Sequence, residues 1–180
     1  SSCFDSKGRN LSVNGPVQEA VCLIRSIVSV LSTMAFAPSS SVTLKGAQQA
    51  LEAGIAEAIK MNLKVTVAIC DAGGNIIALQ RMDGAMPVSA EVASGKAKSA
   101  VLFARETRIL EASANGGKSN GNERAALLSA GHLLMEGGVP IVDAAHGGIV
   151  AGCGVSGAAP AEDAAIAKKA IAALTPASKL

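Results

Sequence analysis

Residues 63–82, LKVTVAICDAGGNIIALQRM, contain two short runs of β-forming side chains separated by a glycine turn, and this segment constrains the fold most. In the first run, Val65, Val67 and Ile69 occupy alternate positions and therefore share one face of a strand. The two glycines of DAGGN can adopt the positive φ angles that tight hairpin turns require. Strands joined by so short a turn pair antiparallel, so we expect an α+β fold built on an antiparallel sheet.

Helical patterns lie on both sides of the hairpin. Apolar spacing predicts a helix over about 43–62, capped by Thr43 or Ser41. An alanine-rich stripe predicts a second helix over 88–113, and a proline followed by two acids predicts a third over 160–174. GGVPIV and GGIVAGCGV are predicted strands separated by the turn DAAHGG. The segment ERAALLSAGHLLM begins as a helix, and its end fits a helix or a strand equally well.

Residues 1–40 differ from the rest and form a predicted N-terminal extension, with one folded domain over 41–180. From Pro16 onward, apolar residues recur at helical spacing and predict an amphipathic helix: Val17, Val21, Ile24, Val28 and Leu31. Met34 is a plausible natural start, so the extension is open to three interpretations: a leader, a targeting segment or a segment added to the natural chain. We expect a cytoplasmic protein, although residues 1–37 leave secretion or organelle import open.

Composition excludes several functions. The chain has three Phe, no Trp or Tyr and a net charge of +2, without a Lys/Arg cluster. Nucleic-acid binding is therefore not expected, because it relies on aromatic platforms and basic grooves. The apolar stretches are too short or too interrupted to cross a membrane. The four cysteines fit no zinc spacing, and we expect Cys70 and Cys153 to be small buried hydrophobes in strands.

The segment GCGVSG, residues 152–157, matches the G-x-G-x-x-G spacing of a dinucleotide-binding loop. That loop requires a βαβ unit and an acidic residue about 20 positions later. Only a helix and a short tail follow Gly157, so the fingerprint fails on its context. We expect a steric role instead, in which Gly152, Gly154 and Gly157 allow close packing against the alanine-rich helix.

Several motifs together resemble one known family. VAICDAGGNIIALQRMDGA, ASGKAKSA, GGVPI and GCGVSG followed by ED are similar to the GlcG/HbpS family, the haem-degrading or DUF336 domain. The same domain forms the C-terminal part of PduO-type corrinoid adenosyltransferases. The resemblance covers about 42–174. It implies a profilin-like antiparallel sheet of about five strands flanked by helices, with residues 132–135 forming one strand, and homo-oligomers from dimers to octamers.

The resemblance also implies a ligand, since some members bind haem. In those relatives a threonine that follows the Lys-Ala helix meets the iron, and Thr107 lies in the corresponding stretch. His132 has equal weight as an axial ligand, because histidine binds haem iron well. A pocket would be lined by aliphatic side chains together with Met82, Met86 and Phe103. The remaining histidine, His146, is expected to be an exposed turn residue. Haem is therefore the expected cofactor.

Two other functions remain open on the sequence. A cofactor-free enzyme acting on a small carboxylate or carbonyl compound would use Arg81 to bind the carboxylate and Asp83 or His132 to move a proton, with Lys96 reaching the same place. Arg81 and Asp83 fit equally an ion pair that only fixes the turn. Lys96, at the edge of its helix stripe, fits equally a side chain that snorkels toward water. The last possibility is an oligomeric scaffold, favoured by the lack of a dense catalytic cluster.

Overall fold

The computed structural model describes residues 3–4, 10–11, 20, 24, 40–115, 131–143 and 147–174. The chain divides into two compact units, Ser1–Ser39 and Ser40–Leu180. In the first unit, strands β1 (Cys3–Phe4) and β2 (Asn10–Leu11) pair antiparallel, and Ala20 and Ile24 are helical. The rest of the helix predicted from Pro16 lies outside the described residues. No helix in the described part of the chain is long and apolar enough to cross a membrane.

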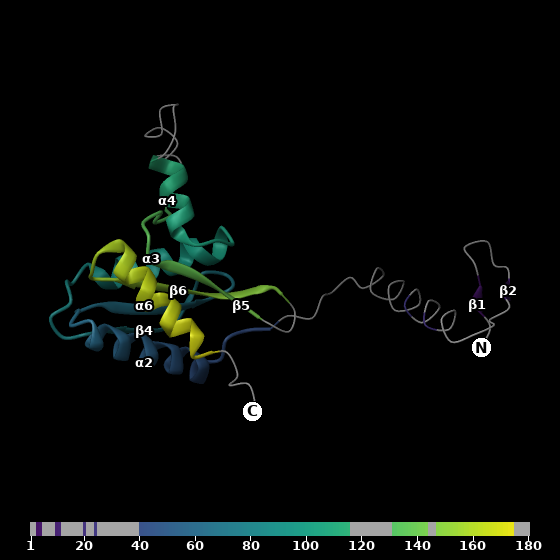
Figure 1. Cartoon of the computed structure of the whole chain (residues 1–180), viewed down its shortest axis with the longest axis horizontal. Coiled ribbons are helices and arrows are strands. Elements are labelled where there is room, and N and C mark those ends of the chain that lie inside the picture. The colour runs from purple at the N-terminus through teal and green to yellow at the C-terminus, as the bar shows by residue number, and fades with distance from the viewer. Residues whose placement is uncertain are drawn as a thin grey trace. The chain divides into compact units, whose positions relative to one another are not determined.

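The second unit is built on a four-stranded antiparallel sheet with the order β4-β3-β6-β5 (Figure 1). Its strands are β3 (Thr66–Asp71), β4 (Ile76–Arg81), β5 (Gly138–Val142) and β6 (Ile149–Ser156). The predicted hairpin and the α+β class are confirmed. The sheet has four strands where about five were expected, because residues 132–135 run outside any strand.

Helices α2 (Leu44–Lys60) and α6 (Pro160–Ala172) pack together on one face of the sheet. Thr43 caps α2 as predicted, since its Oγ1 accepts a hydrogen bond from the Gly46 N–H at 3.1 Å. The main core lies between these helices and the strands, and it is built from aliphatic and small side chains. Its fully buried members include Ala47, Ala50, Val65, Val67, Ile69, Val155 and Ile166. Val65, Val67 and Ile69 share one face, as predicted.

Helix α3 (Ser89–Leu102) covers the opposite face and packs closely on β6. A Cβ on Gly152 would overlap the carbonyl oxygen of Ala97, and one on Gly154 would overlap that of Ala93. The predicted steric role is therefore confirmed for these two glycines. Gly157 differs, because a Cβ there would lie 2.5 Å from the carbonyl oxygen of Lys64, away from α3. Its φ of 140° also favours glycine.

The helix predicted over 88–113 is wrong as a single element. It is interrupted after Leu102 by a break of four residues, 103–106, and α4 (Thr107–Asn115) begins directly after the break. Ala104 within the break has a φ of 55°, which a continuous α-helix does not allow. In Figure 1, α4 extends away from the sheet, so the break changes the direction of the chain. The break places Thr107 beside the start of β5.

Cys70 and Cys153 are free and fully buried in adjacent central strands, as predicted. Burial raises the pKa of the Cys70 thiol to about 11 and that of Cys153 to about 12. Thiolates react and bind metals far better than thiols, so both side chains are chemically quiet at neutral pH.

Candidate functional site

His132 lies where three segments meet: the end of α3, the start of α4 and residues 131–136. The Leu133 N–H donates to Ser99 Oγ of α3 at 2.9 Å, and the Glu136 N–H donates to Glu111 Oε2 of α4 at 2.6 Å. The His132 ring packs edge-on against Phe103, with 5.1 Å between ring centroids and 81° between planes. We call this place the His132 junction.

The hydrogen bonding of His132 is incomplete. Its Nδ1 is buried and has no hydrogen-bond partner among the described residues. A buried polar atom without a partner costs about 1–3 kcal/mol, so such atoms are uncommon in folded proteins. The cost favours a role for His132 beyond packing.

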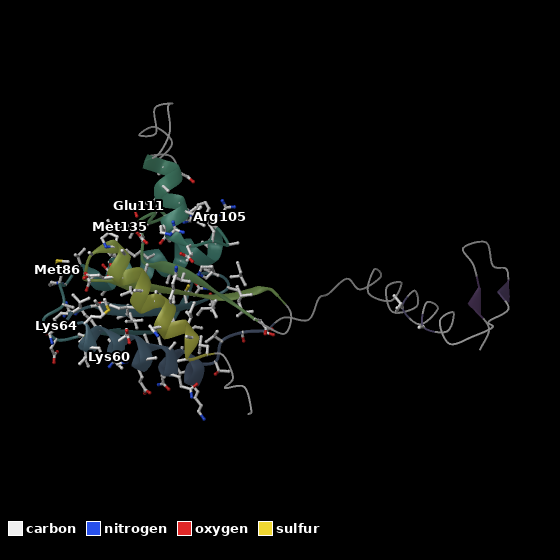
Figure 2. The ribbon with its side chains drawn as sticks, in the orientation of Figure 1. Lys60, Lys64, Met86, Arg105, Glu111 and Met135 are labelled. Carbon is white, nitrogen blue, oxygen red and sulfur yellow. The ribbon has the colours of Figure 1, made fainter. Side chains whose placement is uncertain are left out.

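Exposed apolar side chains come from the same three segments. Leu102 ends α3, Ile109 lies in the first turn of α4, and Met135 follows His132 by three residues; each is more than two-fifths exposed. Arg105, in the break between the helices, adds an exposed positive charge. Figure 2 labels Arg105, Glu111 and Met135 around the base of α4. The segments that meet at the His132 junction thus carry an imidazole, exposed apolar side chains and a cation.

Thr107, the predicted iron contact, is fully buried next to the junction. Its Oγ1 accepts a hydrogen bond from the Gly138 N–H at 2.8 Å and lies 3.3 Å from the Gly138 carbonyl oxygen, to which it donates. The hydroxyl therefore uses both its donor and its acceptor capacity on one residue of β5, Gly138. The side chain ties α4 to the start of that strand, and an iron ligand would have to displace these contacts.

Met82, the third predicted cofactor residue, lies elsewhere. It follows β4 and packs, partly buried, against the core between the sheet and helices α2 and α6. β4 and β5 form opposite edges of the sheet, and Thr107 is bonded to β5. The structure therefore brings Thr107 and His132 to one region and does not bring Met82 to it. Met86 is exposed, and His146 lies outside the described residues.

Lys96 does not snorkel toward water, and that interpretation is wrong. Lys96 and Asp163 are 1% and 2% exposed, and Nζ lies 2.8 Å from Asp163 Oδ2. Asp163 Oδ1 accepts a hydrogen bond from the Ala158 N–H at 3.1 Å. Burial raises the pKa of the Asp163 carboxyl, and the hydrogen bond and charge of Lys96 oppose that rise. This buried pair joins α3 to α6. Sequence reasoning identified Asp163 only as an acid of the first turn of α6.

Arg81 and Asp83, the other two predicted catalytic residues, are exposed at and just after the end of β4. Within the described part of the chain, no hydrogen bond or ion pair joins Arg81, Asp83 and Lys96 to one another. Lys96 instead forms an ion pair with Asp163. The geometry therefore gives these three side chains no common site, and their catalytic roles stay predictions.

A cavity of about 850 Å³ lies among the start of α2, the end of β5 and the C-terminal part of α6. Its walls are largely aliphatic and include Val42, Val150, Ile171 and Leu174, with Lys168 as a basic group. None of the predicted site residues lines it. Among the described residues, its lining includes no His, Cys, Met or Tyr, which are the side chains that bind haem iron.

Comparison with known proteins supports the family resemblance. The family model described as haem degrading protein HbpS-like matches residues 42–172. Protein GlcG of Escherichia coli K12 is 41% identical over 107 residues, which are 59% of this chain and 74% of GlcG.

Two solved structures share the fold. A crystal structure of a double mutant of HbpS from Streptomyces reticuli has a TM-score of 0.66 and 32% identity, over 76% of this chain and 89% of that one. The crystal structure of a PduOC:heme complex has a TM-score of 0.68 and 28% identity, over 76% of this chain and 96% of that one. One of these neighbours was thus solved with haem.

Proposed function

Because the chain belongs to the HbpS-like family of haem degrading proteins, we propose that it binds haem or a related tetrapyrrole at the His132 junction. The observation that carries this proposal is the buried Nδ1 of His132, which has no partner among the described residues, in a ring held by Phe103. The haem named in the PduOC:heme complex, at 28% identity, supports the ligand class. The biological use that we propose is haem or iron handling.

The residues of the junction fit the parts of a haem molecule. An imidazole binds haem iron strongly, so His132 is the residue that would hold the iron. The exposed Leu102, Ile109 and Met135 offer apolar contact to the macrocycle. Arg105 can pair with a propionate carboxylate. Haem held there would supply iron-centred redox chemistry, and these side chains would orient it.

Thr107 has a different role in this proposal from the one the resemblance implied. Its hydroxyl fixes Gly138 and, through it, the segment that carries His132. Thr107 is therefore a positioning residue, and His132 is the ligand. Met82 has no part in the site, because it packs in the core on the other side of the sheet.

Hemin titration of the full chain tests this proposal. We expect a Soret shift for the natural chain, and for His132→Ala an altered band and affinity lower by about tenfold or more, the factor that about 1.4 kcal/mol gives. Met82→Leu, a change of similar volume away from the junction, is the matched control and should leave the titration unchanged. The absence of a Soret shift, or equal titrations for His132→Ala and Met82→Leu, would overturn the proposal.

A further inference from the structure

One stripe of helix α3 contacts the segment that carries His132. Gly95, Ser99 and Phe103 lie four positions apart, on α3 and at the residue that ends it. Residues four apart on an α-helix lie above one another on the same face. We call these three residues the α3 seat. Gly95 and Ser99 belong to the motif ASGKAKSA, and neither residue has a role in the proposed haem site as it stands.

Two consecutive residues, His132 and Leu133, contact all three positions of the α3 seat. The His132 ring lies edge-on against Phe103, with 5.1 Å between the ring centroids. The Leu133 N–H donates a hydrogen bond to Ser99 Oγ at 2.9 Å. The Leu133 side chain lies over Gly95, because a Cβ added to Gly95 would be 2.5 Å from Leu133 Cδ1 and 3.1 Å from Leu133 Cβ. His132 and Leu133 are thus held by one face of one helix.

The contacts of Ser99 and Gly95 depend on the identity of these two residues. Residues 132–134 belong to no helix or strand, so their backbone N–H groups have no partner from regular structure. The hydroxyl of Ser99 supplies an acceptor for one of them, and Ser99 is fully buried. Gly95 acts by its small size, since the lack of a Cβ leaves room for the Leu133 side chain. Alanine at either position would disturb the seating of Leu133.

We propose that the α3 seat sets the direction of the His132 imidazole and thereby prepares it to bind iron. Ser99 and Gly95 are positioning residues, which act through Leu133. The Leu133 N–H and the His132 carbonyl belong to one planar peptide unit, so the bond to Ser99 fixes the plane next to the imidazole. The contact with Phe103 fixes the ring itself. The ligand rests on the proposed function, whereas the direction of the ring is a property of the haem-free chain.

A ligating side chain that is already held in place loses little freedom when its ligand binds. The α3 seat provides this hold at His132 and at the residue that follows it. The contact from α4 is more remote, because Glu111 accepts from the N–H of Glu136, four residues beyond the imidazole. Ser99 is fully buried, so an effect of Ser99 on haem binding has to pass through the segment that carries His132.

Ser99→Ala tests the inference, with Ser94→Ala as the matched control. Both variants lose one hydroxyl from α3, but Ser94 Oγ donates within the helix, to the Ala90 carbonyl at 2.7 Å. The imidazole signals of the haem-free full chain are recorded by NMR, and His132→Ala identifies the signal of His132. We expect Ser99→Ala to shift this signal and to lower the affinity for hemin by about threefold to tenfold, as the loss of one hydrogen bond typically does. Ser94→Ala should change neither.

Gly95→Ala and its rescue provide the second test. The added methyl group should displace Leu133 and shift the NMR signal of His132. Gly95→Ala/Leu133→Ala removes two of the leucine atoms that would collide, Cγ and Cδ1, and should return the signal toward that of the natural chain. A loss of packing alone would lower the unfolding midpoint of Gly95→Ala without moving the signal of the ring.

The outcomes separate this inference from the proposed function. A natural chain that shows no Soret shift with hemin refutes the proposed function, and the NMR signals then decide whether the α3 seat orients the ring. His132 signals that are the same in Ser99→Ala and Ser94→Ala would overturn the inference, even when hemin binds. If Gly95→Ala does not fold, the comparison of the two serine variants decides.

Discussion

The buried charge of Lys96 is paired with that of a single residue, Asp163, which lies 67 positions away in the sequence. Helical periodicity placed it correctly in a helix beside an alanine stripe, but could not reveal that Asp163 lies within 2.8 Å. From the sequence, Asp163 could be identified only as an acidic residue in the first turn of the last helix. Burial of a charge is decided by its partner, and a partner on another element leaves no local pattern in the sequence. The same holds for His132, whose surroundings come from three segments.

Removing Lys96 alone should destabilise the fold strongly. Lys96→Met leaves the Asp163 carboxylate buried without its cation, which typically costs about 3–5 kcal/mol. Lys96→Met/Asp163→Leu should recover most of that loss, because the pair is then replaced by apolar contacts. Urea unfolding measures the free energy of unfolding of both variants. The exposed Lys98→Met is the control and should change the free energy of unfolding by about 0.5 kcal/mol or less. If Lys96→Met proved as stable as Lys98→Met, the result would contradict the pairing of Lys96 with Asp163.

At the scale of elements, α3 and β6 approach so closely because β6 has glycine where α3 crosses it. The sequence predicted this steric role, since the dinucleotide loop lacked its structural context. It did not predict the break after Leu102, because apolar residues keep their helical spacing across it and Ala104 is a good helix former. The break coincides with the Thr107–Gly138 contact, which joins residues 31 positions apart. Here a tertiary contact overrides the local preference of these residues for a continuous helix.

Gly154→Ala should be severely destabilising. A Cβ there would overlap backbone atoms of Ala93 and Ala97, so α3 would have to move away from the sheet. Overpacking of this kind typically costs about 1–3 kcal/mol, and more where backbone must shift. Gly148→Ala is the control, because no atom of the described residues lies within 4 Å of its added Cβ. Thermal unfolding of both proteins checks the prediction, and equal midpoints would refute it.

At the scale of the whole molecule, the main core lies in the second unit. Among the described residues, all its buried members lie between Ala47 and Ala170. We therefore expect a chain of residues 40–180 to unfold at the same midpoint as the full chain and to bind hemin equally. Calorimetry and titration of the two proteins measure this. A lower midpoint for the shorter chain would show that residues 1–39 contribute to its stability.

At β5, an edge strand of the sheet, Gly138 and Pro140 direct their backbone groups away from β6, because the Val155 N–H donates to the neighbouring Gly137 carbonyl. A strand whose outward groups are occupied by a threonine hydroxyl, or lack a donor at a proline, cannot serve as the template for another molecule. Within the described residues, Thr107 and Pro140 therefore protect the β5 edge of this sheet against pairing with another molecule.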